Sequence, residues 1–162
     1  MTTIEIWTLG IAGYAAIIST FVFGWDAYKW FHTGPEVRLT ASTGVKMVGG
    51  GQIDPNTYVS VTAVNLGDRA TTITNLGFVY YKSRFKALFR RNHPDKAFII
   101  TSPSQAQPIP YRFEAGAQWI GLARQGEDLK QMIRNGNLFV VLYHAHGGQG
   151  VRYKLTLREF AS

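Results

Sequence analysis

The feature that most constrains this chain is a run of 20 residues without a charged side chain, from Ile6 to Trp25. An α-helix of that length spans about 30 Å, which matches the hydrocarbon thickness of a bilayer. Glu5 and Asp26 flank the run, and aromatic rings of the kind found at membrane interfaces gather at its two ends. These membrane-interface anchors are Trp7, Trp25, Tyr28 and Trp30. The run predicts a transmembrane anchor helix with a juxtamembrane extension over residues 1–33.

A cleaved signal peptide and the buried helix of a soluble protein are the alternatives for this run. A signal peptide has a basic region before a shorter apolar core and a small-residue cleavage site after it. No Lys or Arg precedes this core, which continues into Trp25-Asp26-Ala27. Its length and lack of charge therefore favour an anchor.

The orientation of such an anchor follows from the basic residues near its ends. None precedes the helix, whereas Lys29, Arg38 and Lys46 follow it. Because cytoplasmic flanks carry the excess of Lys and Arg, we expect the N-terminus outside and the C-terminal domain in the cytoplasm. The predicted location is the cell inner membrane, with a single pass.

One face of the predicted helix carries small residues at every fourth position. Small side chains let helix backbones approach closely in lipid, where packing drives association. The stripe therefore predicts a docking face for a partner transmembrane helix, although transmembrane helices are also generally rich in small residues. Its members are Thr8, Ala12, Ala16, Thr20 and Gly24.

Residues 34–162 have the composition and patterning of one all-β domain. The chain has no Cys, which excludes disulfides and thiolate metal sites. Its 17 Gly suit turns, and its 14% aromatic residues suit the strands between them. Loops are expected at 49–51 and 54–56 and a hairpin turn at 147–150. A helix is expected at 127–135, with Leu129, Met132 and Ile133 on its apolar side. Strands are predicted at 37–42, 45–48, 57–66, 71–82, 98–101, 111–113, 117–123, 138–144 and 151–157.

Seven to nine short strands with frequent turns predict an immunoglobulin-like antiparallel β-sandwich with Greek-key connections. A small closed barrel is the alternative. The absence of alternating strands and helices argues against a parallel sheet.

Two segments of the domain resemble a pattern common in uncharacterised bacterial proteins. The first is 61–73, with Asn65, Gly67 and Arg69 before Thr72-Ile73, followed by Gly77-Phe78; the second is 109–116, with Pro110, Glu114 and Gly116. Those proteins combine an N-terminal membrane anchor with an immunoglobulin-like sandwich. The resemblance implies the fold and no activity, because its residues belong to turns and strands. The chain departs from the pattern in a long basic insertion, 82–96.

This insertion holds six cations and one anion, a local charge of +5 in a chain whose net charge is +7. A helical turn would place Phe85, Leu88 and Phe89 on one face with cations beside them, as in a short interfacial amphipathic helix. Docking on a lipid leaflet or a partner protein, a plain solvated loop, and nucleic-acid binding are the open interpretations. The predicted lipid- or partner-binding residues are Lys82, Arg84, Phe85, Lys86, Leu88, Phe89, Arg90 and Arg91.

Candidate chemistry is sparse in this sequence. His144 and His146 would share one face of a strand, with His93 as a third ligand, but a metal site needs three or four converging ligands. The glycine-rich 147–150 segment lacks the Lys and helix of a P-loop. We therefore expect no enzyme activity, no metal and no cofactor.

The leading hypothesis is a non-catalytic accessory subunit of a larger integral membrane complex. A respiratory or photosynthetic complex is one host that we consider. The expected partners are integral membrane protein subunits and anionic lipid headgroups, and nucleic acid is not expected. The alternative is a membrane-tethered sensor or effector whose sandwich binds a soluble ligand or nucleic acid. That alternative predicts a concave pocket rather than a flat contact surface.

Overall fold

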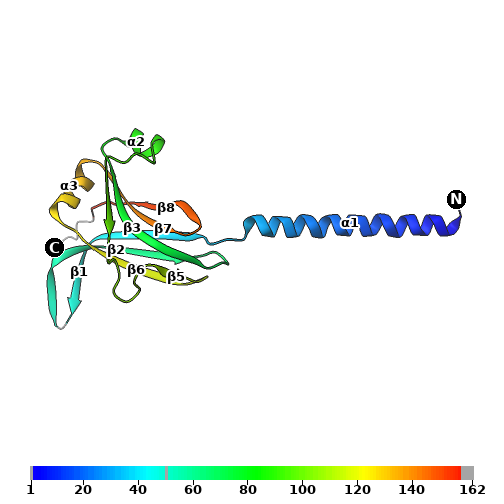
Figure 1. Ribbon diagram of the computed structural model, residues 1–162, viewed down its shortest axis with the longest axis horizontal. Coiled ribbons are helices and arrows are strands. Elements are labelled where there is room, and N and C mark those ends of the chain that lie inside the picture. The colour runs from blue at the N-terminus through cyan, green and yellow to red at the C-terminus, as the bar shows by residue number, and fades with distance from the viewer. Residues whose placement is uncertain (1, 50, 158–162) are drawn as a thin grey trace. The chain divides into compact units, whose positions relative to one another are not determined.

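The computed structural model describes residues 2–49 and 51–157. The chain divides into two compact units, Met1–Gly34 and Pro35–Ser162. The first unit is helical, and the second consists of two antiparallel sheets with two short helices (Figure 1). A mostly β chain with one N-terminal apolar helix confirms the broad architecture expected from the sequence.

The first unit is helix α1, Thr3–His32. At its start the backbone N–H of Thr2 donates to Glu5 Oε2 at 2.9 Å, and at its end the Thr33 N–H donates to the Lys29 carbonyl. Pro35 then follows, which disfavours helical geometry for the residue before it. The segment Thr3–Trp30 has a mean hydropathy of 1.8, and it is the one helix in the described residues long and apolar enough to cross a membrane.

The second unit stacks two sheets. One has the strand order β1 (Val37–Gly49), β2 (Gln52–Asn65), β6 (Gln118–Arg124). The other has the order β4 (Lys96–Ile100), β3 (Thr71–Tyr81), β7 (Asn137–His144), β8 (Gly147–Lys154), and β5 (Tyr111–Phe113) also pairs with β3. Helices α2 (Arg84–Phe89) and α3 (Glu127–Asn135) lie between strands in the chain. The presence of two separate sheets argues against the small closed barrel, the alternative to a sandwich.

The core lies between the sheets and follows the period-two alternation of their strands. In β2, Val59, Val61 and Ala63 are fully buried, while the residues between them are half-exposed. Trp119 of β6 is fully buried and lies against Gly121, where an added Cβ would sit 2.4 Å from the indole ring. Helix α3 covers one margin with three residues of its predicted apolar side: Leu129, Met132 and Ile133.

A second, smaller cluster lies on the outer face of the five-stranded sheet. Its buried members are Val79, Tyr81 and Val141, and Ala87 of α2 packs against them with Phe139 and Tyr143. Strands β3 and β7 are therefore buried on both faces over part of their length. This explains why residues 76–81 and 138–143 are nearly continuous apolar runs rather than alternating ones.

One predicted strand break, one predicted loop and one predicted turn are wrong. The two predicted strands at 37–42 and 45–48 form the single strand β1, which continues through register shifts after Ser42 and Lys46, with Gly44 at φ 74°. The predicted loop at 54–56 belongs to β2. There the turn-forming Asp54 side chain is satisfied locally, since it accepts hydrogen bonds from the Asn56 N–H and the Tyr58 hydroxyl.

The predicted hairpin turn at 147–150 is also wrong, because those glycines begin β8. The chain turns instead at Ala145–His146, between the paired residues His144 and Gly147. The Ala145 N–H donates to the Thr72 carbonyl at 2.9 Å, which fastens the turn to β3.

Candidate interaction surface

Helix α2 begins the basic insertion and is fixed to the sheet from two sides. Ala87 packs on the outer cluster, and Asp95 accepts a hydrogen bond from the Lys82 backbone N–H at 2.9 Å and pairs with the Lys86 ammonium. The Lys86 hydrogen bond, followed by that of the Lys82 N–H, lowers the pKa of the Asp95 carboxyl. The insertion is thus an ordered element rather than a plain loop.

The three large apolar side chains of α2 are exposed rather than packed on the sheet. Phe85, Leu88 and Phe89 expose 77%, 72% and 77% of their surface, respectively. Their spacing places them on one face of the helix, as the sequence predicted. Such a contiguous exposed apolar face is characteristic of a surface that contacts lipid or another protein.

Basic residues distant in sequence join this segment and form what we call the cationic groove. It consists of two adjoining hollows of about 510 and 610 Å³ that share Arg84, Asn137 and Lys154. Within the described residues, no Asp or Glu lines either hollow. The six cations of the groove are Lys82, Arg84, Arg91, Arg134, Arg152 and Lys154.

Sequence reasoning missed three of these cations: Arg134 of α3 and Arg152 and Lys154 of β8. They lie far along the chain from the basic insertion and carry no local motif. The positions of Arg152 and Lys154 beside it depend on the pairing of β8 with β7, in which Arg152 faces Val141 and Lys154 faces Phe139. Of the predicted cations, Lys86 and Arg90 line neither hollow, and Lys86 is paired with Asp95.

Arg152 connects strand β8 to the basic insertion. Its guanidinium donates to the Tyr81 hydroxyl at 3.1 Å and to the Arg91 carbonyl at 2.8 Å, and it lies 5.8 Å from the centre of the Tyr81 ring. Its Nε atom is buried without a hydrogen-bond partner among the described residues. Among the described residues, the partners of this partly buried cation are neutral groups.

The predicted docking stripe lies along α1, whose 18-residue apolar window has no buried residue. Both of its hydroxyls are satisfied within the helix, because Thr8 donates to the Ile4 carbonyl at 2.9 Å and Thr20 to the Ala16 carbonyl at 2.8 Å. Ala12 and Gly24 lie on the same helix. The stripe thus offers small side chains without an unsatisfied polar group, which is what lipid or a packed helix requires.

The four aromatic anchors are exposed at the two ends of the same helix. Trp7 and Trp25 are separated by about 27 Å at 1.5 Å per residue. Trp25 stacks on Tyr28 with ring centres 6.0 Å apart, and the Lys29 ammonium lies 5.7 Å from the Trp25 ring centre. Trp30 is exposed one turn beyond Trp25.

The histidines do not form the strand-face pair that the sequence suggested. His144 ends β7, His146 lies in the following turn, and the Thr71 hydroxyl is within 3.3 and 3.1 Å of their Nδ1 atoms. His93 lies in the loop after α2. Burial, followed by the neighbouring His146, lowers the pKa of His144. Among the described residues no three His, Asp or Glu side chains are placed to hold a metal ion.

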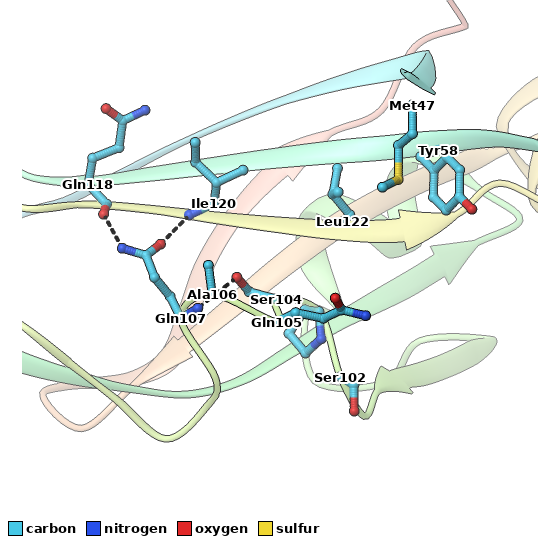
Figure 2. A pocket seen from close by; sticks show the side chains of 11 residues that line it. Met47, Tyr58, Ser102, Ser104, Gln105, Ala106, Gln107, Gln118, Ile120 and Leu122 are labelled. Carbon is cyan, nitrogen blue, oxygen red and sulfur yellow. Dashed lines mark hydrogen bonds between the residues drawn. The ribbon is translucent and has the colours of Figure 1, made fainter. Parts of the chain in front are cut away.

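A further pocket of about 710 Å³ lies on the outer face of the three-stranded sheet, beside the 101–110 loop (Figure 2). Gln107 holds this loop on the edge of β6: its amide donates to the Gln118 carbonyl at 3.0 Å and accepts from the Ile120 N–H at 3.1 Å. The pocket combines apolar and polar side chains, including Met47, Tyr58, Ser104, Gln105, Ile120 and Leu122.

Comparisons with known proteins add no assignment. No protein family and no curated protein match the chain. Among solved structures, a target of the Northeast Structural Genomics Consortium matches 78% of this chain and 83% of its own, at 8% identity and a TM-score of 0.32. A score that low carries no argument about the fold or the function.

Proposed function

We propose that this chain is a non-catalytic, membrane-anchored accessory subunit of a larger integral membrane complex. The observation that carries the proposal is α1, a helix of 30 residues whose apolar window has no buried residue within the chain. Lipid or partner helices would cover these side chains, and the small-residue stripe at Thr8, Ala12, Ala16, Thr20 and Gly24 would take a partner helix. The sandwich would then cover the surface of the complex.

The charge distribution supports a cytoplasmic position for the sandwich in the inner membrane. No Lys or Arg precedes the helix, whereas Lys29, Arg38 and Lys46 follow it. The exposed apolar face of α2 and the cations around it would contact the leaflet surface or a partner protein.

The finer fold that we infer for the second unit is an immunoglobulin-like Greek key. Its strand orders, β1-β2-β6 and β4-β3-β7-β8, correspond to the A-B-E and C′-C-F-G orders of immunoglobulin domains. The pairing of β5 with β3 departs from that pattern. Such sandwiches serve many binding roles, so this inference supports the fold and names no partner.

The test is gentle purification of the native chain in detergent or nanodiscs, with mass spectrometry of everything that co-migrates. We expect a stoichiometric set of integral membrane subunits, and we expect Ala16→Leu to release the chain because it obstructs the stripe. Ala15→Leu is the matched control, since its side chain points about 100° away from that of Ala16. A chain that migrates alone would contradict the accessory role.

The pocket beside Gln107 favours a second candidate, a membrane-tethered module that binds a soluble ligand (Figure 2). Its volume of about 710 Å³ and its mixture of Met, Ile and Leu with Ser, Gln and Tyr suit a small, partly apolar molecule. Ile120→Arg would fill this pocket with a charge. Loss of a ligand response without loss of co-migrating subunits would favour this candidate over the accessory role.

A further inference from the structure

The cationic groove concentrates positive charge that the described chain does not neutralise. Of its six cations, only Arg134 has a carboxylate within ion-pair distance in the described residues, Glu127 at 4.0 Å. Arg84, Arg91 and Lys154 have none there, and the partners of Arg152 are neutral groups. Mutually repelling cations held around one hollow favour an anion that bridges them. Planar guanidinium groups are well suited to phosphate oxygens.

The edge of the groove identifies the source of that anion. Leu88 lines one of the two hollows and, with Phe85 and Phe89, belongs to the exposed apolar face of α2. A soluble phosphate would neutralise the cations and leave these three side chains in water. A lipid surface would both neutralise the cations and cover the apolar side chains, because it presents phosphates beside an acyl boundary.

We propose that the cationic groove binds the phosphate of an anionic phospholipid, while Phe85, Leu88 and Phe89 enter the adjacent acyl boundary. The proposal rests on the proposed function, which brings the sandwich to a membrane, and it assigns the surface to lipid rather than to protein. Arg84, Arg152 and Lys154 hold the phosphate, although they come from α2 and β8. Asn137 adds an amide at the position that the two hollows share.

The absence of Cys from the sequence permits a direct test in the full chain. Asn92→Cys, in the loop after α2, carries an environment-sensitive fluorophore, and the chain is held in neutral detergent micelles. These are titrated with phosphatidylglycerol, phosphatidylcholine, glycerol phosphate, inorganic phosphate or polyglutamate. Anionic lipid is expected to shift the emission to the blue, and the other four probes are not.

The matched variants separate the groove from general charge. Arg84→Gln with Lys154→Gln is expected to weaken the lipid response about 25-fold, since each cation near an anionic surface contributes about fivefold. Arg38→Gln with Lys46→Gln removes the same charge from exposed positions on β1. This double variant is expected to change the lipid response about twofold or less at physiological salt. Unchanged thermal unfolding of both pairs shows that they remain folded.

Three results would overturn the proposal. Equal losses in the two double variants would mean diffuse attraction and no groove site. An equal response to inorganic phosphate or glycerol phosphate would assign the groove to a soluble ligand, and a response to polyglutamate alone would assign it to an acidic protein. The micelle titration does not require α1 to span a bilayer, so its failure is distinguishable from failure of the proposed anchor.

Discussion

Asn65 is fully buried at the end of β2, and its backbone and side chain hold two turns together. Its amide donates to the carbonyls of Arg69 and Phe113 at 2.8 and 3.1 Å, and its Oδ1 accepts from the Gly67 N–H at 3.1 Å. The motif that resembles bacterial sandwich proteins therefore contains a residue with a structural role. No apolar side chain of similar size could replace these hydrogen bonds.

Asn65→Ala is expected to destabilise the sandwich by about 2 kcal/mol or more, because the buried Phe113 carbonyl would lose its donor and two further hydrogen bonds would be lost. The measurement is thermal unfolding of the full chain in a neutral detergent. Asn92→Ala, in an exposed loop, is the control and should stay within about 0.5 kcal/mol. Equal melting temperatures for the two variants would contradict the role assigned to Asn65.

His144 makes the stability depend on pH. Burial, followed by the neighbouring His146, lowers the pKa of this imidazole below its ordinary value of 6.5. The unfolded chain therefore takes up the proton at a higher pH than the folded chain. The stability that His144 supports is complete above about pH 6.5 and is lost as the pH falls through the folded pKa.

Melting temperatures at about pH 7.5 and 5.5 measure this effect. We expect a lower value at the acidic pH and a smaller difference in His144→Gln. A hydrogen bond from the Asn56 backbone lowers the pKa of the Asp54 carboxyl, and one from the Lys86 ammonium lowers that of Asp95. Protonation of these two carboxyls therefore reduces the stability only at still lower pH. An unchanged difference in the variant would assign the pH dependence to other groups.

At the scale of elements, helix α2 packs one side on the domain and exposes the other to solvent. Ala87 contacts the outer cluster, whereas Phe85, Leu88 and Phe89 are exposed. Replacing these three residues with Ser should leave the melting temperature nearly unchanged, because mostly exposed side chains contribute little packing within the domain. The same triple change should weaken binding to anionic micelles.

Ala87→Asp provides the opposite control, since it would bury a charge against Tyr81 and Val141. We expect a clear loss of stability in thermal unfolding. Lys86→Ser should also cost some stability, because it removes the partner of Asp95. If the Ser triple variant melted as early as Ala87→Asp, the apolar side chains would belong to the core and the interaction surface would be wrong.

Elements were predictable where one local pattern determines them. The uncharged run gave α1, alternation gave most strands, and the apolar side of 127–135 gave α3. Tertiary pairing overrode turn residues at Asp54-Pro55-Asn56 and at the glycines of β8. The groove could not be predicted, because the contact of Arg152 with Arg91 joins residues 61 apart through strand register.

At the scale of the whole molecule, we assign a different role to each of the two compact units. The Met1–Gly34 unit supplies apolar surface for a bilayer, and the Pro35–Ser162 unit supplies a folded surface with gathered cations. A chain with a net charge of +7 places six cations around one groove of the second unit. Tethering at a membrane raises the effective concentration of such a surface near lipid, so that a weak contact suffices.

The central claim is that α1 spans the membrane and holds the sandwich in the cytoplasm. The most direct measurement is labelling of Thr2→Cys and Ser104→Cys in intact cells with a membrane-impermeant maleimide, since the natural chain has no Cys. Our account predicts that Thr2→Cys reacts from outside and that Ser104→Cys reacts only after permeabilisation. Labelling of Ser104→Cys in intact cells, or release of the chain from membranes by alkaline carbonate, would contradict it.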